Sequence, residues 1–208
     1  MSRWIVISAY SIGAPYEEEI KILEASLLKF KVPYKFYPYR SRGSWANNCE
    51  HNATIIQRAF RQLQRNLVWL DSDAEVLAYP SLFNTYKYDI GLYKRMHTPE
   101  QCKELGTKHH WDTGTMFMRY KPEVMEMMFT LNTPMNTLAD SGDGWIIQSF
   151  NKHVDNVISG RYKSNLRIGI LPVTYSYIFN TKQPEELEHK HEVVIKHNQA
   201  SRRFKYVI

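Results

Sequence analysis

The sequence of 208 residues predicts an α/β fold with a mostly parallel central sheet, helices on both faces and a mixed edge. Short apolar runs alternate with helical patterns through the first 70 residues, which is typical of a parallel sheet. Two of these runs, WIVISA and LVWL, are almost wholly apolar, as in strands that are buried on both faces. Later short strands are separated by irregular stretches, which indicates a mixed edge. The length fits a single domain over residues 1–208.

Strands and helices alternate in the first half of the chain. Gly13 and the proline two residues later mark a turn after the first apolar run. Apolar residues then recur at three- and four-residue intervals behind three glutamates, whose charge suits a helix N-terminus, and Pro33 ends this helix. The expected elements are a strand over 4–9, a helix over 16–30, a strand over 34–37, a helix over 45–63 and a strand over 67–70.

The second half of the chain is less regular. Residues 94–110 are polar, basic and aperiodic, which predicts a loop. Pro122 is a typical first residue of a helix. The expected elements are a strand over 89–93, a strand over 115–118, helices over 123–131 and 143–153, and short strands over 166–170 and 193–195.

Composition excludes several classes of protein. Hydrophobic residues make up 43% and charged residues 23%, so a disordered chain is not expected. No apolar run approaches the roughly 18 residues of a membrane span, and the N-terminal run is too short for a signal peptide. The two cysteines, Cys49 and Cys102, form no C-x-x-C pair. We therefore expect a soluble, cytoplasmic protein.

The charge balance favours anionic partners. Lys and Arg number 27 against 21 Asp and Glu, a net charge of +6, and 13% of the residues are aromatic. This excess indicates attraction to nucleotides, nucleic acid or acidic surfaces.

Two carboxylates follow the LVWL strand. Asp71 and Asp73 are two residues apart at the edge of an α/β sheet where ligands bind. Carboxylates on one side repel each other unless a cation lies between them, and Mg²⁺ or Mn²⁺ prefers such oxygen ligands. This pattern therefore indicates a divalent metal that bridges to a diphosphate. A strand-end turn, in which Asp bonds the local backbone, explains it equally well.

A histidine follows the last apolar strand in the same way. His197 is a good ligand type for Mn²⁺. Ser201, Arg202 and Arg203 follow it and are suited to contacting phosphate oxygens. Taken alone, this segment also fits a solvated basic tail with an incidental histidine.

Seven segments in order resemble one family, the small nucleotide-diphospho-sugar transferases with the Rossmann-like GT-A fold. This family is related to the glycogenin-like and lipopolysaccharide galactosyltransferase-like enzymes, and the chain most resembles its phage-encoded and bacterial members. The segments are Tyr10-Ser-Ile-Gly-Ala-Pro-Tyr16, Gly43-Ser-Trp45-x-x-Asn48, Val68-Trp-Leu-Asp-Ser-Asp-Ala74, Thr113-Gly-Thr115, Asp143-Gly-Trp-Ile-Ile-Gln148, Leu171-Pro172 before Tyr175, and His197-Asn-Gln-Ala-Ser-Arg202.

The resemblance implies a role for each matching residue. Asp71, Asp73 and His197 are expected to hold Mn²⁺ or Mg²⁺ against the donor diphosphate. Asp143 is expected to accept the proton of the acceptor hydroxyl or to orient the acceptor, with Asp112 and Asp140 as further candidates, although a helix N-cap also explains Asp143. The expected donor-binding residues are Tyr10, Ser11, Arg42, Trp45, Asn48, Asn52, Asp71, Gly114, Thr115, Ser201 and Arg202.

The chain departs from the family at one position. The family has Lys four residues after the helix asparagine, where it reaches the diphosphate, and this chain has Asn52. Arg40, Arg42 and Arg58 are candidates to replace that charge.

The acceptor is open at this stage. The basic residues around 94–108 and at the C-terminus favour a hydroxylated base in phage DNA, in a bacterial or phage-infected cell. A glycan, lipid or protein acceptor fits the family equally. A non-catalytic nucleotide-sugar-binding module is a further alternative, whereas a nucleotidyltransferase lacks its glycine-rich phosphate loop here.

Overall fold

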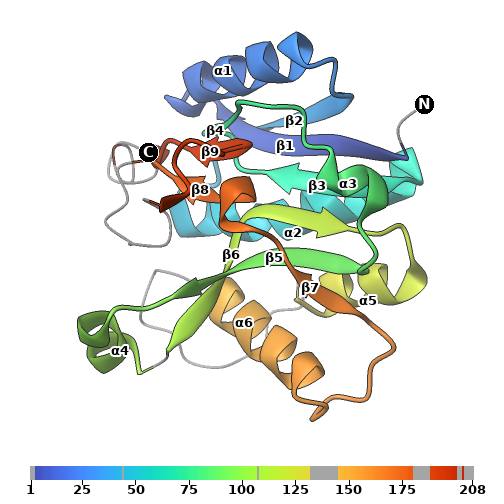
Figure 1. Ribbon diagram of the computed structural model, residues 1–208. Coiled ribbons are helices and arrows are strands. Elements are labelled where there is room, and N and C mark those ends of the chain that lie inside the picture. The colour runs from blue at the N-terminus through green and yellow to red at the C-terminus, as the bar shows by residue number, and fades with distance from the viewer. Residues whose placement is uncertain are drawn as a thin grey trace.

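In the described part of the chain, six strands form the central sheet. The computed structural model describes residues 3–43, 45–106, 108–131, 145–179, 188–200 and 203. The strands lie in the spatial order β2-β1-β3-β6-β5-β7 (Figure 1). Their bounds are Trp4–Ile12 for β1, Tyr34–Arg40 for β2, Asn66–Leu70 for β3, Ile90–Met96 for β5, His109–Met118 for β6 and Ile168–Ile170 for β7.

The strand directions confirm the predicted fold class. β1 runs parallel to both β2 and β3, and β7 runs parallel to β5. β6 runs antiparallel to its two neighbours, β3 and β5, because it returns along β5 after a short connection. The sheet is therefore mostly parallel and becomes mixed in the half that the later strands form. The reversed strand lies inside this half, between β3 and β5.

Helices cover both faces of the sheet. α1 (Tyr16–Lys29) lies on one face, while α2 (Trp45–Leu63), α5 (Pro122–Leu131) and α6 (Trp145–Ile158) cover the other (Figure 1). Strand β1 is apolar on both faces because its alternate side chains point into opposite hydrophobic clusters. Ile5 packs with the α2 cluster and Val6 with the α1 cluster. Among the described residues, no helix is long and apolar enough to cross a membrane.

Helix α1 follows directly from its sequence. Ile20, Leu23 and Leu27 recur at helical spacing and are all buried against β1 and its neighbours. Burial of each such side chain stabilises the fold by about 1.5–3 kcal/mol. The structure ends the helix at Lys29, one residue before the predicted end.

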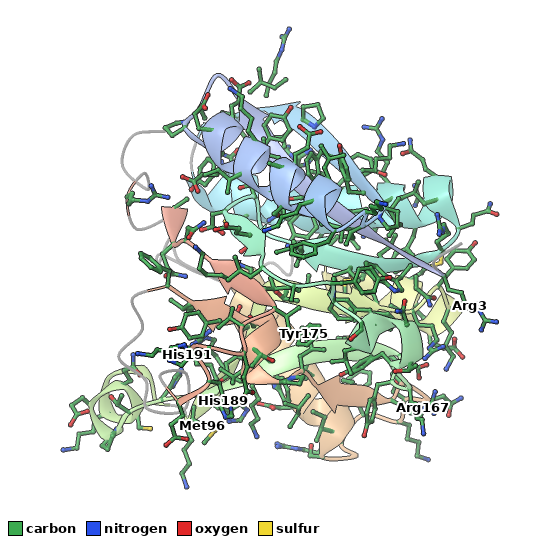
Figure 2. The ribbon with its side chains drawn as sticks, turned by 45° about the horizontal axis from the view of Figure 1, so that its top comes forward. Arg3, Met96, Arg167, Tyr175, His189 and His191 are labelled. Carbon is green, nitrogen blue, oxygen red and sulfur yellow. The ribbon has the colours of Figure 1, made fainter. Side chains whose placement is uncertain are left out.

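A small second sheet pairs a strand near the end of the chain with a strand that follows β3 in the sequence. It contains β4 (Ala74–Val76), β9 (Ile195–His197) and β8 (Tyr177–Ile178), in the order β4-β9-β8 (Figure 1). β9 lies two residues later than the predicted strand over 193–195, and β4 and β8 were not predicted because they are so short. A four-residue helix, α3 (Leu82–Thr85), and a 3₁₀ turn (Val173–Tyr175) support this sheet. Figure 2 shows Tyr175 in the interior, where it packs against Phe83.

The loop prediction for residues 94–110 is wrong. β5 continues to Met96, a helix α4 spans Pro99–Leu105, and β6 begins at His109 (Figure 1). Thr98 and Gln101 form a reciprocal capping box at the start of α4, and Gly106 ends it in the left-handed conformation with φ of 67°. These capping signals fix a helix that is too short to show hydrophobic periodicity. Met96, at the end of β5, is half exposed (Figure 2).

Candidate active site

Three predicted metal ligands come together where β3, β4 and β9 meet. Asp71 follows β3, Asp73 precedes β4, and His197 ends β9. One ligand atom from each of the three lies within 4.8 Å of the others. Asp73 Oδ1 is 3.7 Å from His197 Nδ1. These donor atoms and this spacing are compatible with a divalent cation.

Backbone hydrogen bonds hold the two acids and the histidine in register. Ala74 lies opposite His197 in the β4–β9 pair, and the Asn198 N–H donates to the Asp73 carbonyl at 3.0 Å. The chain then turns at Gln199, whose φ is 57°, and the Ala200 N–H donates to Asp73 Oδ2 at 2.7 Å. Asp73 therefore anchors the segment that follows the histidine.

The His197 ring is oriented by β6. Thr115 Oγ1 lies 2.8 Å from His197 Nε2, so the other ring nitrogen, Nδ1, faces the acids. A Cβ on Gly114 would lie 3.0 Å from His197 Cε1, closer than ordinary contact. Glycine at this position lets the imidazole sit against the strand. Gly114 and Thr115 were predicted from the sequence to bind the donor, but their contacts with His197 were not predicted.

The three ionisable groups perturb one another. Burial, and then the Asp73 charge, raises the pKa of Asp71 to about 7, although the Trp69 indole N–H donates to its Oδ1. Burial also acts to raise the pKa of Asp73, but His197 and the Ala200 N–H outweigh it and lower that pKa. Burial acts to lower the pKa of His197, and Asp73 outweighs it and raises that pKa. Two crowded carboxylates of this kind favour a bound cation.

A buried ion pair adjoins this cluster. Arg95 donates to Asp112 Oδ2 at 2.7 Å and to the Ser176 carbonyl at 3.2 Å, while the Gly114 N–H donates to Asp112 Oδ1. Burial opposes ionisation of Asp112, but Arg95 and then His197 hold its pKa below the ordinary range. From the sequence, Asp112 is predicted only as a further candidate base, and Arg95 falls within the predicted loop.

The end of β1 offers an unpartnered hydroxyl. Ser11 Oγ is buried and has no hydrogen-bond partner among the described residues, and Tyr10 beside it is half buried. Ser11 lies opposite Tyr39 in the parallel β1–β2 pair. Burial, and then the nearby Cys49 and Asp71, raises the pKa of Tyr39 to about 12. The Ser11 hydroxyl therefore lies in the region of the acids, where a ligand can satisfy it.

The loop before α2 is held by Asn48. Its Oδ1 accepts from the Arg42 N–H at 2.8 Å, and its Nδ2 donates to Ser41 Oγ at 3.4 Å. The Arg42 guanidinium lies 3.0 Å from His51 Nδ1, and Asn52 is half buried on the same helix. The Asn48 amide thus positions the loop that carries Arg42.

Some predicted residues lie outside the described part. Asp143, Ser201 and Arg202 are among them, as are Asp140 and the side chain of Trp45. Their roles stay predictions.

The fold defines the class of protein to which the chain is similar. No protein-family model and no curated protein sequence matches it. Solved structures do match, and the three described below are glycosyltransferases. The sequence identities to these structures are 16% or less, so the likeness is one of fold, and the predicted GT-A resemblance is confirmed at that level.

Three structures illustrate the likeness. A glycosyltransferase involved in the glycosylation of the major capsid of PBCV-1 matches with TM-score 0.65 and 16% identity, over 97% of this chain and 96% of that one. The bifunctional glycosyltransferase WbbM matches with TM-score 0.57 and 13% identity, over 95% of this chain and 46% of its own. Mouse xyloside xylosyltransferase 1 matches with TM-score 0.54 and 12% identity, over 95% of this chain and 98% of that one.

Proposed function

We propose that the protein is a metal-dependent glycosyltransferase that moves a sugar from a nucleotide-diphosphate donor to an acceptor hydroxyl. The cluster of Asp71, Asp73 and His197 within a glycosyltransferase fold carries this proposal. Its mixture of carboxylate oxygen and imidazole nitrogen suits Mn²⁺ better than Mg²⁺.

The chemistry explains why two acids are placed together. Transfer breaks the bond between sugar C1 and the diphosphate, and negative charge grows on the leaving phosphate. A bound divalent cation supplies positive charge against that phosphate. Asp71, Asp73 and His197 would hold the cation, and Thr115 keeps the histidine ring turned toward the acids. Ser201 and Arg202 would approach the phosphates, since Asp73 anchors Ala200, the residue before them.

The acceptor hydroxyl must also lose a proton. Asp143 is our proposed base. Asp112 is a weaker base because Arg95 stabilises its charged form, so its geometry favours a role in shaping the site.

The donor-binding residues are proposed from position. Ser11 offers a hydroxyl that has no hydrogen-bond partner in the described part of the chain, and Tyr10, Arg42, Asn48 and Asn52 lie on elements around the same end of the sheet. We propose that Gly114, Thr115, Trp45, Ser201 and Arg202 complete the donor site.

A glycan acceptor is better supported than DNA. One structural neighbour acts in capsid glycosylation and another is named for a xyloside. Arg95 belongs to the basic stretch that suggested a DNA acceptor, but its side chain is buried and pairs with Asp112. A DNA acceptor would require tight binding at low salt that falls steeply as salt rises.

Hydrolysis of a nucleotide-sugar panel with Mn²⁺ tests the proposal. Asp73→Asn keeps an oxygen for the Ala200 N–H but removes the charge, and we expect about a 100-fold loss of turnover. Glu18→Gln, an exposed acid on α1, is the matched control and should retain full turnover. Equal turnover in wild type and Asp73→Asn would refute metal-assisted transfer. Donor binding without turnover would indicate a binding module.

A further inference from the structure

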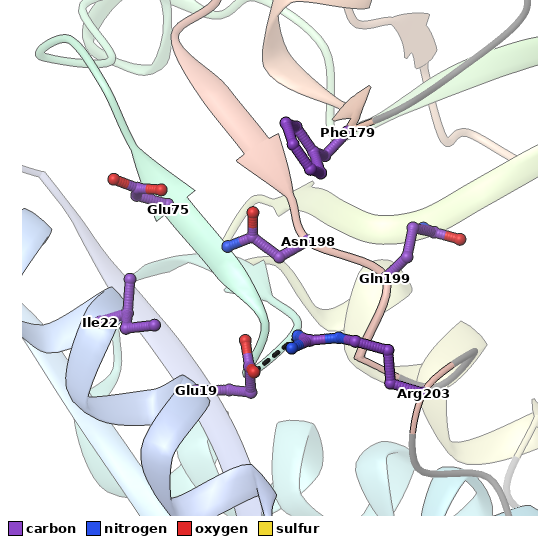
Figure 3. A pocket seen from close by; sticks show the side chains of 7 residues that line it. All are labelled: Glu19, Ile22, Glu75, Phe179, Asn198, Gln199 and Arg203. Carbon is purple, nitrogen blue, oxygen red and sulfur yellow. Dashed lines mark hydrogen bonds and ion pairs between the residues drawn. The ribbon is translucent and has the colours of Figure 1, made fainter.

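A cavity of about 550 Å³ lies beside the small sheet (Figure 3). α1 contributes Glu19 and Ile22 from its first turns, and β4 contributes Glu75. The segment after β9 closes another side with Asn198 and Gln199. The volume falls within the range of small-molecule sites, roughly 300–1,000 Å³.

The cavity is separated from the metal cluster by the β4–β9 pair. Side chains alternate along a strand, so Lys196 faces away from the side of His197. Lys196 Nζ binds Glu75 Oε2 at 2.7 Å, which places this pair on the cavity side of the ladder. Glu75 lies on β4 and Asp73 directly precedes that strand, so the two sites adjoin along the chain.

Among the described residues that line the cavity, the acidic side chains are each paired with a basic one. Glu19, only 6% exposed, accepts from Arg203 at 2.6 Å across the cavity wall (Figure 3). Glu75 is paired with Lys196 in the same way. The four charges sum to zero, and an ionic ligand would have to compete with an existing ion pair. The lining therefore favours a neutral ligand.

The remaining lining offers amides and apolar surface. Asn198 and Gln199 each present side-chain donors and an acceptor. Phe179 is 48% exposed and Ile22 is 44% exposed, so both present apolar surface. A sugar ring carries hydroxyl groups that both donate and accept, together with apolar C–H faces that pack on an aromatic ring. A neutral polyhydroxylated ring matches each of these features.

We propose that this cavity binds a neutral carbohydrate and holds part of a glycan acceptor. This inference rests on the proposed glycosyltransferase function and names the substrate class. Because Asn198 of the cavity directly follows His197 of the metal cluster, a glycan of several sugars can be anchored here while another of its sugars reaches the metal cluster. The cavity then contributes to acceptor affinity and the metal cluster to chemistry.

Ligand-observed NMR tests the proposal without metal or donor present. The probes are neutral oligosaccharides (lactose, maltose, cellobiose, xylobiose and mannobiose, with their tetrasaccharides where these exist), uridine, and a DNA duplex. We expect at least one oligosaccharide to bind wild type. Phe179→Ala should weaken that binding at least tenfold, and Asn198→Ala should weaken it as well. Tyr162→Ala removes a similarly exposed aromatic ring outside the cavity lining and should leave binding unchanged.

Three results would overturn the assignment. The first is that no oligosaccharide binds. The second is that oligosaccharide binding survives in both cavity variants while their melting temperatures match that of wild type. The third is that uridine or DNA binds instead and that this binding depends on Phe179. Because neither metal nor donor is present, each of these results leaves the donor-hydrolysis test of the proposed function standing.

Discussion

Replacing Arg95 by Met should strongly destabilise the protein. The Arg95 and Asp112 side chains are only 8% and 15% exposed, and their charged atoms are 2.7 Å apart. Met retains much of the buried side-chain volume but removes the charge and the donors. Asp112 is then a buried carboxylate whose main stabilising charge is gone, and the Ser176 carbonyl loses the bond that Arg95 donates.

The expected cost follows from this burial. Removing one partner of a buried ion pair costs about 3–5 kcal/mol, because the other charge is left uncompensated. For a chain of this size each kcal/mol lowers the melting temperature by about 2–4 °C. We therefore expect a fall of roughly 6–20 °C. The pKa of Asp112 should rise, since Arg95 is the main influence that lowers it.

Urea unfolding and thermal melts measure this effect. The double variant Arg95→Met with Asp112→Asn removes both charges and should be more stable than Arg95→Met alone. A loss below about 1 kcal/mol for Arg95→Met would refute the reasoning, since exposed pairs cost that little. A double variant as unstable as the sum of its single variants would also contradict it.

Three further outcomes follow from local geometry. Gly114→Ala should displace the His197 ring, since the new Cβ would lie 3.0 Å from its Cε1, and should weaken Mn²⁺ binding measured by titration calorimetry. In Gly160→Ala the new Cβ meets open space and the φ of 70° strains only the turn after α6, so Mn²⁺ binding should be unchanged. Thr98→Ala removes the cap of α4 and should lower the free energy of unfolding by about 1 kcal/mol in urea, whereas an unchanged midpoint would contradict the cap. Burial acts to raise the pKa of Asp89, but hydrogen bonds from Arg167 outweigh it and lower that pKa. The stabilisation that ionised Asp89 gives the folded state is therefore complete above the ordinary carboxyl pKa of about 3.9. It is lost as the pH falls through the lowered pKa of the folded state. Asp89→Asn has no carboxylate to protonate, so its free energy of unfolding should fall less than that of wild type between pH 5 and pH 3.

Much of the architecture was readable from local patterns. Helix α1 and strands β1 and β3 occur where apolar periodicity predicts them, because each buries a face that its own residues define. Several short helices and strands were not predicted, because they are too short to show apolar periodicity. Helix α4 has seven residues, and only its capping residues indicated it.

The candidate site was likewise predicted from the sequence only in part. The sequence placed Asp71 and Asp73 at a strand end and His197 at another, and the family resemblance joined them. It did not indicate that Arg95 is buried, because a cation in a polar stretch reads as exposed. The pairing of Arg95 with Asp112 depends on β5 and β6 folding back on each other.

The amino-acid sequence by itself determined the α/β class and the residue types available for a metal site, since both depend on patterns a few residues long. Only the tertiary structure decided that residues 124 positions apart, Asp73 and His197, approach to 3.7 Å. It also decided that Glu19 and Arg203 meet across a cavity. Such contacts arise from strand pairing and chain reversal over the whole sheet, which no local pattern encodes.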